Sequence, residues 1–507
     1  MNVLPGEAIE LRLNDMTETT QLAEDIAICA RPGWLICLQG DLGTGKTAFA
    51  RAFIRALTNE PDLEVPSPSF SIVQTYECDF ENCRLTILHG DLYRLSDPEE
   101  LREVGLDGSL QTTIRLVEWP EIGSALLDVP DLSIRFESCE NDEARKITLR
   151  GQSSALNSVS RSLAIRTFLD TEWGEGVQRQ RLAGDASARS YETVLLCGEQ
   201  RILMNAPRRP DGPPIRDGKP YSQIAQLAED IERFLEIDEA LASLGLKVPE
   251  IHASDLGAGL MLLEDMGNEL IIDDGRHPIP DRYHAAAELL AHLHRTNAPD
   301  KQGFFEETGL SLRPYGEAAM MIEVELLLDW YAPRFKGAAL SYRERKQFLD
   351  VWSELIKRLG ASDWHLVLRD YHSPNILWQP AERDIRRLGL IDFQDAVYGP
   401  TAYDLASLAQ DARVDVTEEL ERSIFEHYAQ VMAETDQFDK ERFSEAYAIS
   451  CALRTTKILG IFVRLDERDD KPSYLKHLPR IQAYIKRSFE HPSLSDYRDW
   501  CSSVIGL

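Results

Sequence analysis

The chain has 507 residues, which at roughly 150 residues per domain predicts about three compact units. Hydrophobic residues make up 43% and charged residues 28% of it, which is ordinary for a globular protein and excludes a disordered or fibrous chain. Asp and Glu outnumber Lys and Arg by 85 to 55, and the net charge of −30 argues against autonomous, non-specific nucleic-acid binding, because an acidic surface repels phosphates. A local basic patch, or a partner that holds RNA, stays compatible with this charge.

The sequence gives no sign of a membrane span or of secretion. No apolar run approaches the ~20 residues that a membrane span needs. Residues 1–7 lack the basic and apolar regions of a signal peptide. The eight Cys are scattered, and Cys78 and Cys83 have no second pair of Cys or His with which to form a zinc site. We therefore expect reduced thiols and a cytoplasmic protein.

Short apolar runs alternate with helical patterns over the first ~140 residues, as expected of βαβ units. Residues 34–38 predict a buried strand, and residues 47–57 predict a helix with its apolar side chains on one face. Residues 138–160 lose this periodicity around one short strand. The pattern predicts a first domain at residues 1–150 and a linker at residues 151–160.

A glycine-rich loop stands between this strand and this helix, in the context that a P-loop requires. Its glycines let backbone N–H groups point at phosphate oxygens, Lys46 neutralises the β and γ charges, and the Thr47 hydroxyl can bind Mg²⁺. The residues expected to bind ATP here are Gly40, Asp41, Leu42, Gly43, Thr44, Gly45, Lys46 and Thr47. The loop predicts an α/β P-loop NTPase domain in which Lys46 is catalytic.

A P-loop NTPase also needs an acidic group at a strand end near Mg²⁺, and two candidates follow the loop. Glu118 follows a predicted strand at residues 114–117, so we favour it as the catalytic, metal-binding or water-orienting group. Asp91 is the second candidate metal ligand. The alternatives are that Asp91 caps a helix, and that His89 and Trp119 have structural roles.

Three motifs follow the P-loop in order, VPSPSF at residues 65–70, HGDLYR at 89–94 and EWPE at 118–121. Together with the loop they resemble TsaE, the small ATPase needed to make N6-threonylcarbamoyladenosine in tRNA. The resemblance covers about residues 5–150. It implies an ATPase that acts on a TsaB–TsaD pair by cycling ATP, while those partners hold the tRNA.

Beyond the linker, short strands come first and helices later, which is typical of an α+β domain rather than a second doubly wound sheet. Residues 191–196 and 201–204 predict paired strands. A helix-rich stretch follows and is interrupted by apolar runs at residues 259–264, 364–368 and 389–393.

The sequence LRDYHSPNILW at residues 368–378, followed by GLIDFQD at 389–395, has the layout of a kinase catalytic loop and metal-binding loop. Phosphoryl transfer to a hydroxyl needs one carboxylate to orient and deprotonate the acceptor, and an amide and a second carboxylate to hold Mg²⁺. We expect Asp370 to be the catalytic base, with Asn375 and Asp392 as metal ligands. The alternative is a chance loop between two strands.

Two further segments suit ATP binding between the lobes of a kinase. LLEDMG at residues 262–267 predicts a hinge at which Glu264 and Met266 meet the adenine. The loop before the first paired strand could cover the phosphates, although an ordinary hairpin is the alternative. The residues expected to bind ATP in that loop are Gly184, Ser187 and Arg189.

These features resemble the aminoglycoside phosphotransferase family, over about residues 160–500. Within it, LAGDAS at residues 182–187 and LMNAP at 203–207 resemble the AmgK-type kinases, which phosphorylate the anomeric hydroxyl of N-acetylmuramate and N-acetylglucosamine in cell-wall recycling. The resemblance implies an α+β bilobal, protein-kinase-like domain. Its expected parts are the domain at 161–507, an N-lobe at about 161–264, the hinge at 264–268 and a C-lobe at about 269–507.

One feature departs from the general kinase pattern. The strand at residues 201–204 should deliver a Lys to the α and β phosphates, yet Met204 or Asn205 stands there. AmgK-like sequences also lack this Lys, so Mg²⁺ and another cation, Arg189 or Lys219, are expected to neutralise the phosphates. A kinase fold kept as a non-catalytic scaffold is the alternative.

The acceptor pocket is indicated only by acidic and aromatic residues between positions 313 and 331, which suit sugar hydroxyls and aminoglycoside amines equally well. The carboxylates among them are Glu323, Glu325 and Asp329, for which a solvated or packed helix surface is the alternative. Asp395 and Asp404 are expected to brace the metal-binding loop.

Taken whole, the sequence predicts a fusion of a TsaE-like ATPase with an AmgK-like kinase, each with its own site for ATP and Mg²⁺. The resemblances imply an amino-sugar substrate, partners like TsaD and TsaB, tRNA bound only through those partners, and no membrane. In one alternative the kinase acts on an aminoglycoside, choline, homoserine or another small alcohol. In the other, the C-terminal half is a non-catalytic module that positions the ATPase on its partners.

Overall fold

A computed structural model describes most of the chain, which divides into two compact units. The residues that it leaves undescribed are 1–7, 69–70, 81–82, 96–105, 107–110, 124–126, 140–142, 183–188, 209–211, 229–230, 296–309 and 435–437. The first unit comprises residues 1–206 and 251–264. The second comprises residues 207–250 and 265–507.

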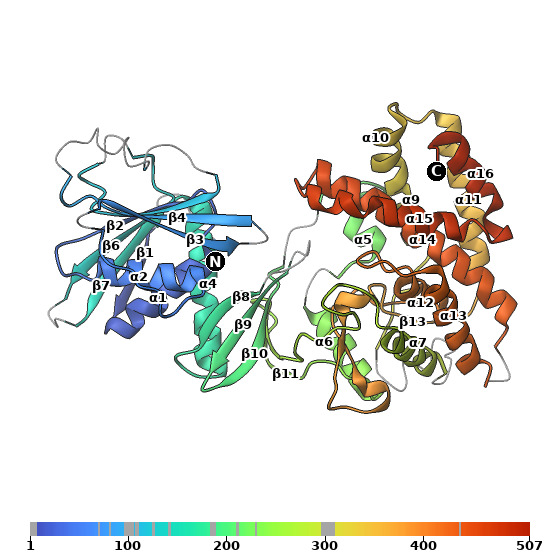
Figure 1. The fold of residues 1–507 in the computed structure, drawn as a ribbon, viewed down its shortest axis with the longest axis horizontal. Coiled ribbons are helices and arrows are strands. Elements are labelled where there is room, and N and C mark those ends of the chain that lie inside the picture. Colours follow the sequence, from blue (N-terminus) through green and yellow to red (C-terminus); the bar gives the residue numbers. More distant parts are fainter. Residues whose placement is uncertain are drawn as a thin grey trace. The chain divides into compact units, whose positions relative to one another are not determined.

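The N-terminal part of the first unit is built on one seven-stranded sheet in the order β1-β7-β6-β2-β5-β4-β3 (Figure 1). Its strands are β1 (Ile9–Leu13), β2 (Leu35–Gln39), β3 (Val73–Phe80), β4 (Cys83–Asp91), β5 (Thr113–Glu118), β6 (Leu132–Ser138) and β7 (Arg145–Gly151). The four central strands β6, β2, β5 and β4 are parallel, and the outer pairs are antiparallel. This sheet confirms the predicted α/β domain.

Two helices pack on each other beside this sheet, α1 (Met16–Cys29) and α2 (Lys46–Thr58). Helix α1 begins at Asp15, whose carboxylate accepts a hydrogen bond from the Glu18 N–H at 2.9 Å and so caps the helix. Helix α2 follows the P-loop directly, and it fully buries Phe49, Phe53 and Ile54 against the sheet. This burial fixes the start of α2, and with it Lys46, at the end of β2.

The expected linker at residues 151–160 is wrong in one respect, because α4 (Ser153–Glu172) occupies most of it. The first half of α4 completes the core of the seven-stranded sheet through Ala155, Leu156 and Val159. Its second half enters the core of the next sheet through Ile165, Phe168 and Leu169. The helix is apolar on different faces in its two halves, so it lacks the single stripe by which sequence patterns reveal a helix.

The first unit ends in a five-stranded antiparallel sheet in the order β11-β12-β10-β9-β8 (Figure 1). Its strands are β8 (Gln178–Leu182), β9 (Ser190–Leu196), β10 (Glu199–Asn205), β11 (Ile251–Asp255) and β12 (Leu260–Glu264). Cys197 and Gly198 both have positive φ, 53° and 86°, which is the two-residue turn that suits the twist of a hairpin. The predicted strand pair is therefore confirmed.

The second unit is mostly helical and carries two short strand pairs. Its helices are α5 (Tyr221–Ala225), α6 (Glu232–Ser243), α7 (Pro280–Arg295), α9 (Glu317–Leu326), the π-helical η1 (Leu327–Tyr331), α10 (Ala332–Lys336), α11 (Tyr342–Gly360), α12 (Ala402–Ala409), α13 (Glu418–Met432), α14 (Lys440–Glu467), α15 (Leu478–Ser488) and α16 (Ser495–Val504). Short 3₁₀ turns are η2 (Ser373–Asn375), η3 (Asp384–Arg387), η4 (Pro472–His477) and η5 (Pro492–Leu494). Strand β13 (Trp364–Val367) pairs with β16 (Val397–Pro400), and β14 (Ile376–Trp378) pairs with β15 (Leu388–Leu390).

Residues 207–250, which we expected in the N-lobe, belong to this second unit. The Phe234 ring of α6 stacks on Phe393 with centroids 4.7 Å apart. The Leu390 N–H donates to the Lys247 carbonyl at 2.9 Å. These contacts tie α6 and the chain after it to the segment that carries the predicted metal-binding loop.

Helix α14 is the central helix of the second unit. It passes a length and composition test for a membrane span, but 78% of its most apolar window is buried inside the structure, as in the core helix of a globular domain. It packs closely on α9, since a Cβ at Gly460 would lie 2.3 Å from the Leu326 carbonyl carbon. Only glycine fits at this crossing, because any larger side chain would clash with the α9 backbone.

Candidate active sites

The P-loop lies at the carboxyl end of β2, in the position expected from the sequence. Gly40 has a φ of 137°, and a Cβ there would lie 2.4 Å from the Phe136 carbonyl oxygen, so only glycine fits. The Lys46 ammonium donates to the carbonyls of Gly40 and Asp41 at 2.6 and 2.8 Å. It also lies 3.8 Å from the centroid of the Trp119 ring. Burial lowers the pKa of Lys46, although the nearby Glu118 carboxylate opposes that shift.

The structure brings both predicted acidic residues to this loop. Asp91 ends β4 and Glu118 ends β5, and the two face each other across neighbouring parallel strands. The Thr47 hydroxyl donates to Glu118 Oε2 at 3.0 Å, and His89 Nε2 lies 3.1 Å from Glu118 Oε1. Parallel strands end at the same sheet edge, which is why residues 71 positions apart meet here.

The structure shows the contacts of Asp91, His89 and Trp119, for which purely structural roles were the alternative. Asp91 does accept a hydrogen bond from the Tyr93 N–H at 3.1 Å, and it also accepts one from the Ser67 hydroxyl at 3.1 Å. His89 is fully buried, yet its ring contacts Glu118 and therefore belongs to the site. Trp119, with a φ of 57°, packs on an apolar cluster and covers Lys46 at the same time.

The donor set at this edge fits Mg²⁺ held together with a nucleotide. Thr47, Glu118 and Asp91 offer hydroxyl and carboxylate oxygens, the ligands that Mg²⁺ prefers. Within the described part of the chain, no three His, Cys, Asp or Glu side chains gather into a metal site of their own. In P-loop sites the metal shares its coordination with phosphate oxygens, and the oxygens of Thr47, Glu118 and Asp91 suit that arrangement.

In the second unit, a buried carboxylate holds the predicted catalytic loop in place. Asp404 of α12 accepts hydrogen bonds from the backbone N–H groups of Leu368 and Arg369, at 2.6 and 2.9 Å. Burial raises the pKa of Asp404 to about 7, against the opposing effect of these two bonds. We expected Asp404 to brace the metal-binding loop, but it braces the catalytic loop. Asp395 accepts a hydrogen bond from the Ala228 N–H at 2.5 Å.

The three predicted kinase residues come together at the ends of β13, β14 and β15. The Asn375 amide donates to the Asp370 carbonyl at 2.9 Å, and its nitrogen lies 3.5 Å from Asp392 Oδ2. Gln394 donates to the other Asp392 oxygen at 2.9 Å. Burial alone would raise the pKa of Asp370, but the charges of neighbouring cations, His372 first among them, outweigh it and lower that pKa. An ionised carboxylate can accept the proton of an acceptor hydroxyl.

The carboxylates of this segment are paired with cations, which favours the alternative of a packed or solvated helix surface over an acceptor pocket. Glu323 is fully buried and bonds to Arg369, Lys457 and the Tyr315 hydroxyl. Glu325 pairs with Arg216 at 2.5 Å, and Asp329 pairs with Arg345 at 2.8 Å. Sequence reasoning missed Lys457; the signal was a cation within the apolar stretch of a long helix.

The two candidates for the position of the usual strand Lys, Met204 and Asn205, differ in their surroundings. The side-chain oxygen of Asn205 accepts two hydrogen bonds from the Arg161 guanidinium of α4, at 3.0 and 2.7 Å. Successive side chains alternate across a strand, so Met204 occupies the opposite face of β10, where it is fully buried. Arg161, a cation beside this strand, is a second residue that the sequence did not reveal.

The remaining predicted ATP contacts are placed less completely. Gly184 and Ser187 lie outside the described residues, and Arg189 stands directly before β9. Glu264 ends β12. The Met266 carbonyl, which could pair with adenine, accepts a hydrogen bond from the Gln379 amide at 2.8 Å.

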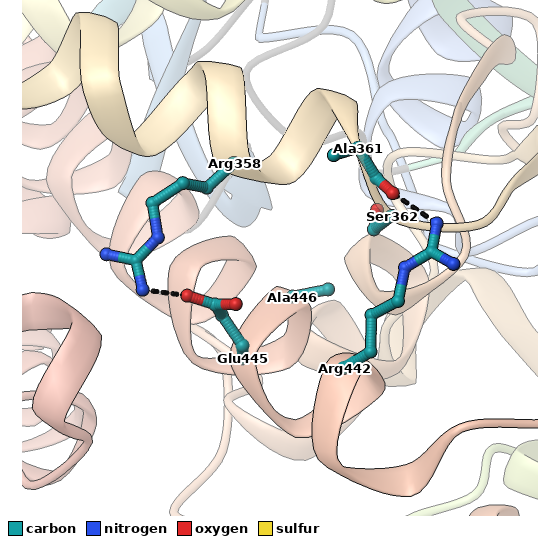
Figure 2. A pocket seen from close by; sticks show the side chains of 6 residues that line it. All are labelled: Arg358, Ala361, Ser362, Arg442, Glu445 and Ala446. Atoms are coloured by element: carbon teal, nitrogen blue, oxygen red, sulfur yellow. Dashed lines mark hydrogen bonds and ion pairs between the residues drawn. The ribbon is translucent and has the colours of Figure 1, made fainter.

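A separate pocket of about 260 Å³ lies between α11 and α14 (Figure 2). Arg358 pairs across it with Glu445, and Arg442 donates to the Ala361 carbonyl. Both guanidinium groups are thus engaged, and none of the predicted site residues lines the pocket.

Comparison with known proteins agrees with this geometry. The family model "Phosphotransferase enzyme family" matches residues 179–439, and "Threonylcarbamoyl adenosine biosynthesis protein TsaE" matches residues 13–147. An N-acetylmuramate/N-acetylglucosamine kinase of Caulobacter vibrioides is 32% identical over 68% of this chain and 96% of that protein. The chain belongs to the phosphotransferase enzyme family and carries a TsaE domain.

Two further relatives match the TsaE domain. The tRNA threonylcarbamoyladenosine biosynthesis protein TsaE of Rickettsia felis is 35% identical over 32% of this chain and 93% of that protein. The crystal structure of Bacillus subtilis YdiB is 26% identical and covers 31% of this chain and 95% of that chain, with a TM-score of 0.25. By its two family-model matches, the chain is a P-loop ATPase domain joined to an ATP-using phosphotransferase domain.

Proposed function

We propose that this protein is bifunctional, with an ATPase that supports tRNA N6-threonylcarbamoyladenosine synthesis and a kinase that phosphorylates the anomeric hydroxyl of N-acetylmuramate and N-acetylglucosamine in cell-wall recycling. The likeness to the Caulobacter kinase over 68% of the chain carries the proposal for the second activity. The TsaE domain supports the first, with TsaB- and TsaD-like proteins as partners that hold the tRNA. Both reactions would take place in the cytoplasm.

In the ATPase, Lys46 and the loop N–H groups bind the nucleotide phosphates, after Lys46 leaves the carbonyls to which it now donates. Bound Mg²⁺ supplies charge neutralisation at the phosphates. Thr47, Glu118 and Asp91 would hold it, and Glu118 orients the attacking water. The bond between His89 and Glu118 fixes that carboxylate in place.

In the kinase, Asp370 orients the acceptor hydroxyl and accepts its proton while the γ-phosphoryl group passes to that oxygen and ADP leaves. Asn375 and Asp392 are the residues that would hold Mg²⁺. Asp404 keeps the loop in shape through its two backbone bonds. Glu264, Met266, Gly184, Ser187 and Arg189 are the proposed contacts to ATP.

Phosphorus NMR tests the kinase directly. Full-length protein with MgATP is offered N-acetylglucosamine and N-acetylmuramate in separate reactions, and a sugar 1-phosphate should form with each. Asp370→Ala should reduce the rate by about 10²-fold or more, because the general base is lost. The exposed carboxylate Asp499 provides a matched control, since Asp499→Ala should leave the rate unchanged. If wild-type protein transfers phosphate to neither sugar, the acceptor is another alcohol or this half is a scaffold.

ATP hydrolysis without sugar tests the other half. Lys46→Ala should lower turnover by about 10²-fold or more, since the phosphate charge is no longer neutralised. Lys146→Ala is the matched control, because Lys146 is half-exposed and pairs only with Glu10 in the described structure. Unchanged hydrolysis in Lys46→Ala contradicts the ATPase assignment. Pull-down of TsaB- and TsaD-like proteins by the wild type tests the partners.

A further inference from the structure

Helix α14 carries three cations on the face that it turns towards α5 and α9. Arg454, Lys457 and Arg464 are three and seven residues apart, a spacing that keeps them on one side of a helix. Lys457 bonds to Glu323 of α9 at 2.8 Å. The Arg464 guanidinium lies 5.2 Å from the ring centroid of Tyr221 in α5.

Among the described residues, one carboxylate, Glu323, bonds directly to a cation of this face. Glu323 is the shared counter-ion of Lys457 and Arg369, and both bonds fall on the same oxygen, Oε1. Its other oxygen accepts from the Tyr315 hydroxyl. Among the described residues, no carboxylate pairs with Arg454 or Arg464 within 4.0 Å. The charges of Asp370 and Asp404 act on Arg454 from a distance, and that of Asp469 acts on Arg464. Lys457 shares its bonded carboxylate with Arg369, so a second anionic group that bonds directly to Lys457 is stabilised.

Lys457 and Arg464 also keep hydrogen-bonding capacity. An ammonium has three N–H donors, and within the described part of the chain Lys457 uses one of them, towards Glu323. Its side chain is 15% exposed, which leaves a path for a ligand. The Nε of Arg464 is buried and makes no hydrogen bond in the described structure. These free donors can be satisfied by carboxylate oxygens.

The cations stand next to the catalytic loop. Arg454 donates to the Arg369 carbonyl at 2.7 Å, and Arg369 is the residue before Asp370. Arg369 itself reaches the same Glu323 carboxylate as Lys457. The charges of Lys457 and Arg454 also contribute to the lowered pKa of Asp370. A ligand that binds to Lys457 would therefore lie beside the reacting hydroxyl.

We propose that Lys457 and Arg464 form an anion subsite that binds a carboxylate carried by the acceptor, beside the catalytic residue Asp370. This inference rests on the proposed kinase activity. N-acetylmuramate bears a lactyl carboxylate that N-acetylglucosamine lacks, so the subsite favours the acidic sugar. Arg454, whose Nη1 donates to the backbone of the catalytic loop, is a positioning residue instead.

Steady-state kinetics with the two sugars test the subsite in the full-length protein. Lys457→Met should raise the KM for N-acetylmuramate by roughly 10- to 100-fold, the range expected for a lost charge-assisted hydrogen bond. The KM for N-acetylglucosamine should rise less, so the ratio of the two KM values reports the subsite. Lys457→Arg should restore most of the preference, and Arg464→Gln should give a smaller loss of the same kind. Lys486→Met, at an exposed position of α15, is the matched control.

Each other outcome rejects the subsite or assigns Lys457 a different role. Equal changes for both sugars, or a fall in kcat for both, would mean that Lys457 serves the transferred phosphoryl group or the fold. Failure of the wild type to phosphorylate either sugar would overturn the proposed function instead. In that case calorimetry decides the subsite separately, since wild type should still bind N-acetylmuramate more tightly than N-acetylglucosamine and Lys457→Met should not. Equal binding of the two sugars by wild type would reject it.

Discussion

Single buried side chains decide the geometry of both sites. In the TsaE domain, one carboxylate, Glu118, contacts the Thr47 hydroxyl and the His89 ring, so this carboxylate is held from two sides. In the kinase, Asp404 accepts hydrogen bonds from the backbone N–H groups of Leu368 and Arg369, the two residues that precede Asp370. Neither arrangement depends on exposed charge, so neither should be weakened by salt.

The pKa of Asp404 predicts how stability depends on pH. An unfolded Asp titrates near ~3.9, and burial raises the folded pKa of Asp404 to about 7. Between these values the folded protein holds a proton that the unfolded chain has lost. The contribution of Asp404 to stability therefore falls as the pH rises from about 4 to about 7, by up to ~1.4 kcal/mol per pH unit.

The variant Asp404→Asn should lack this dependence, because an amide does not titrate. It is expected to be less stable than wild type at pH 5, since one amide oxygen replaces two acceptors, and to approach wild type as the pH rises to 8. Urea unfolding of both proteins at several pH values measures the difference. A difference that is constant across this range contradicts the assigned pKa.

At the scale of elements, a buried charge cluster joins α1, α4 and the first strands of the kinase. Arg179 of β8 donates to Asp25 of α1 at 2.6 Å and to Glu192 of β9 at 2.8 and 2.9 Å. Arg166 of α4 also pairs with Asp25, at 2.9 Å. These side chains are almost fully buried, so each charge depends on its partners.

Removing Arg179 should be severely destabilising. Arg179→Met leaves the buried carboxylates of Asp25 and Glu192 without their shared partner, at an expected cost of about 3–5 kcal/mol. Arg498→Met, which removes a half-exposed ion pair with Asp499, should change stability by no more than about 0.5 kcal/mol. Thermal unfolding of both variants compares them, and equal melting temperatures would argue that the cluster is not formed.

At the scale of the whole molecule, α4 makes the ATPase and the first kinase sheet parts of one compact unit. It contributes to both cores, and the charge cluster lies beside it. The fusion is therefore more than two domains on a flexible tether, because the connecting segment is itself a structural element of each. A tether would leave the two cores complete without it.

Fragments of the ATPase test the role of α4. A fragment of residues 1–164 keeps the apolar side chains that complete the first core, whereas a fragment of residues 1–152 exposes the surface that they cover. We expect the longer fragment to melt at a higher temperature, since burying one such side chain contributes roughly 1.5–3 kcal/mol. Equal melting temperatures would show that the domain ends before α4, as the sequence suggested.

Much of each site could be predicted from the sequence, because its chemical groups lie a few residues apart along the chain. The P-loop, with Gly40 and Lys46, and the triad of Asp370, Asn375 and Asp392 depend on a turn or a strand end that local residue order specifies. Such patterns need no knowledge of distant contacts. The same holds for the strands whose bounds were predicted, most of which differ from the observed ones by one or two residues.

Only the tertiary structure decided which charged side chains pair with each other. Glu323 and Lys457 are far apart in the chain, and Asp25 and Arg179 are 154 residues apart, so no local pattern relates them. The same reason explains the missed helix α4, whose apolar residues serve two cores and form no single stripe. The sequence by itself determined which chemistry each half carries, through residues close along the chain. The tertiary structure decided which charges surround that chemistry, since burial and ion pairing arise from segments that meet only in the fold.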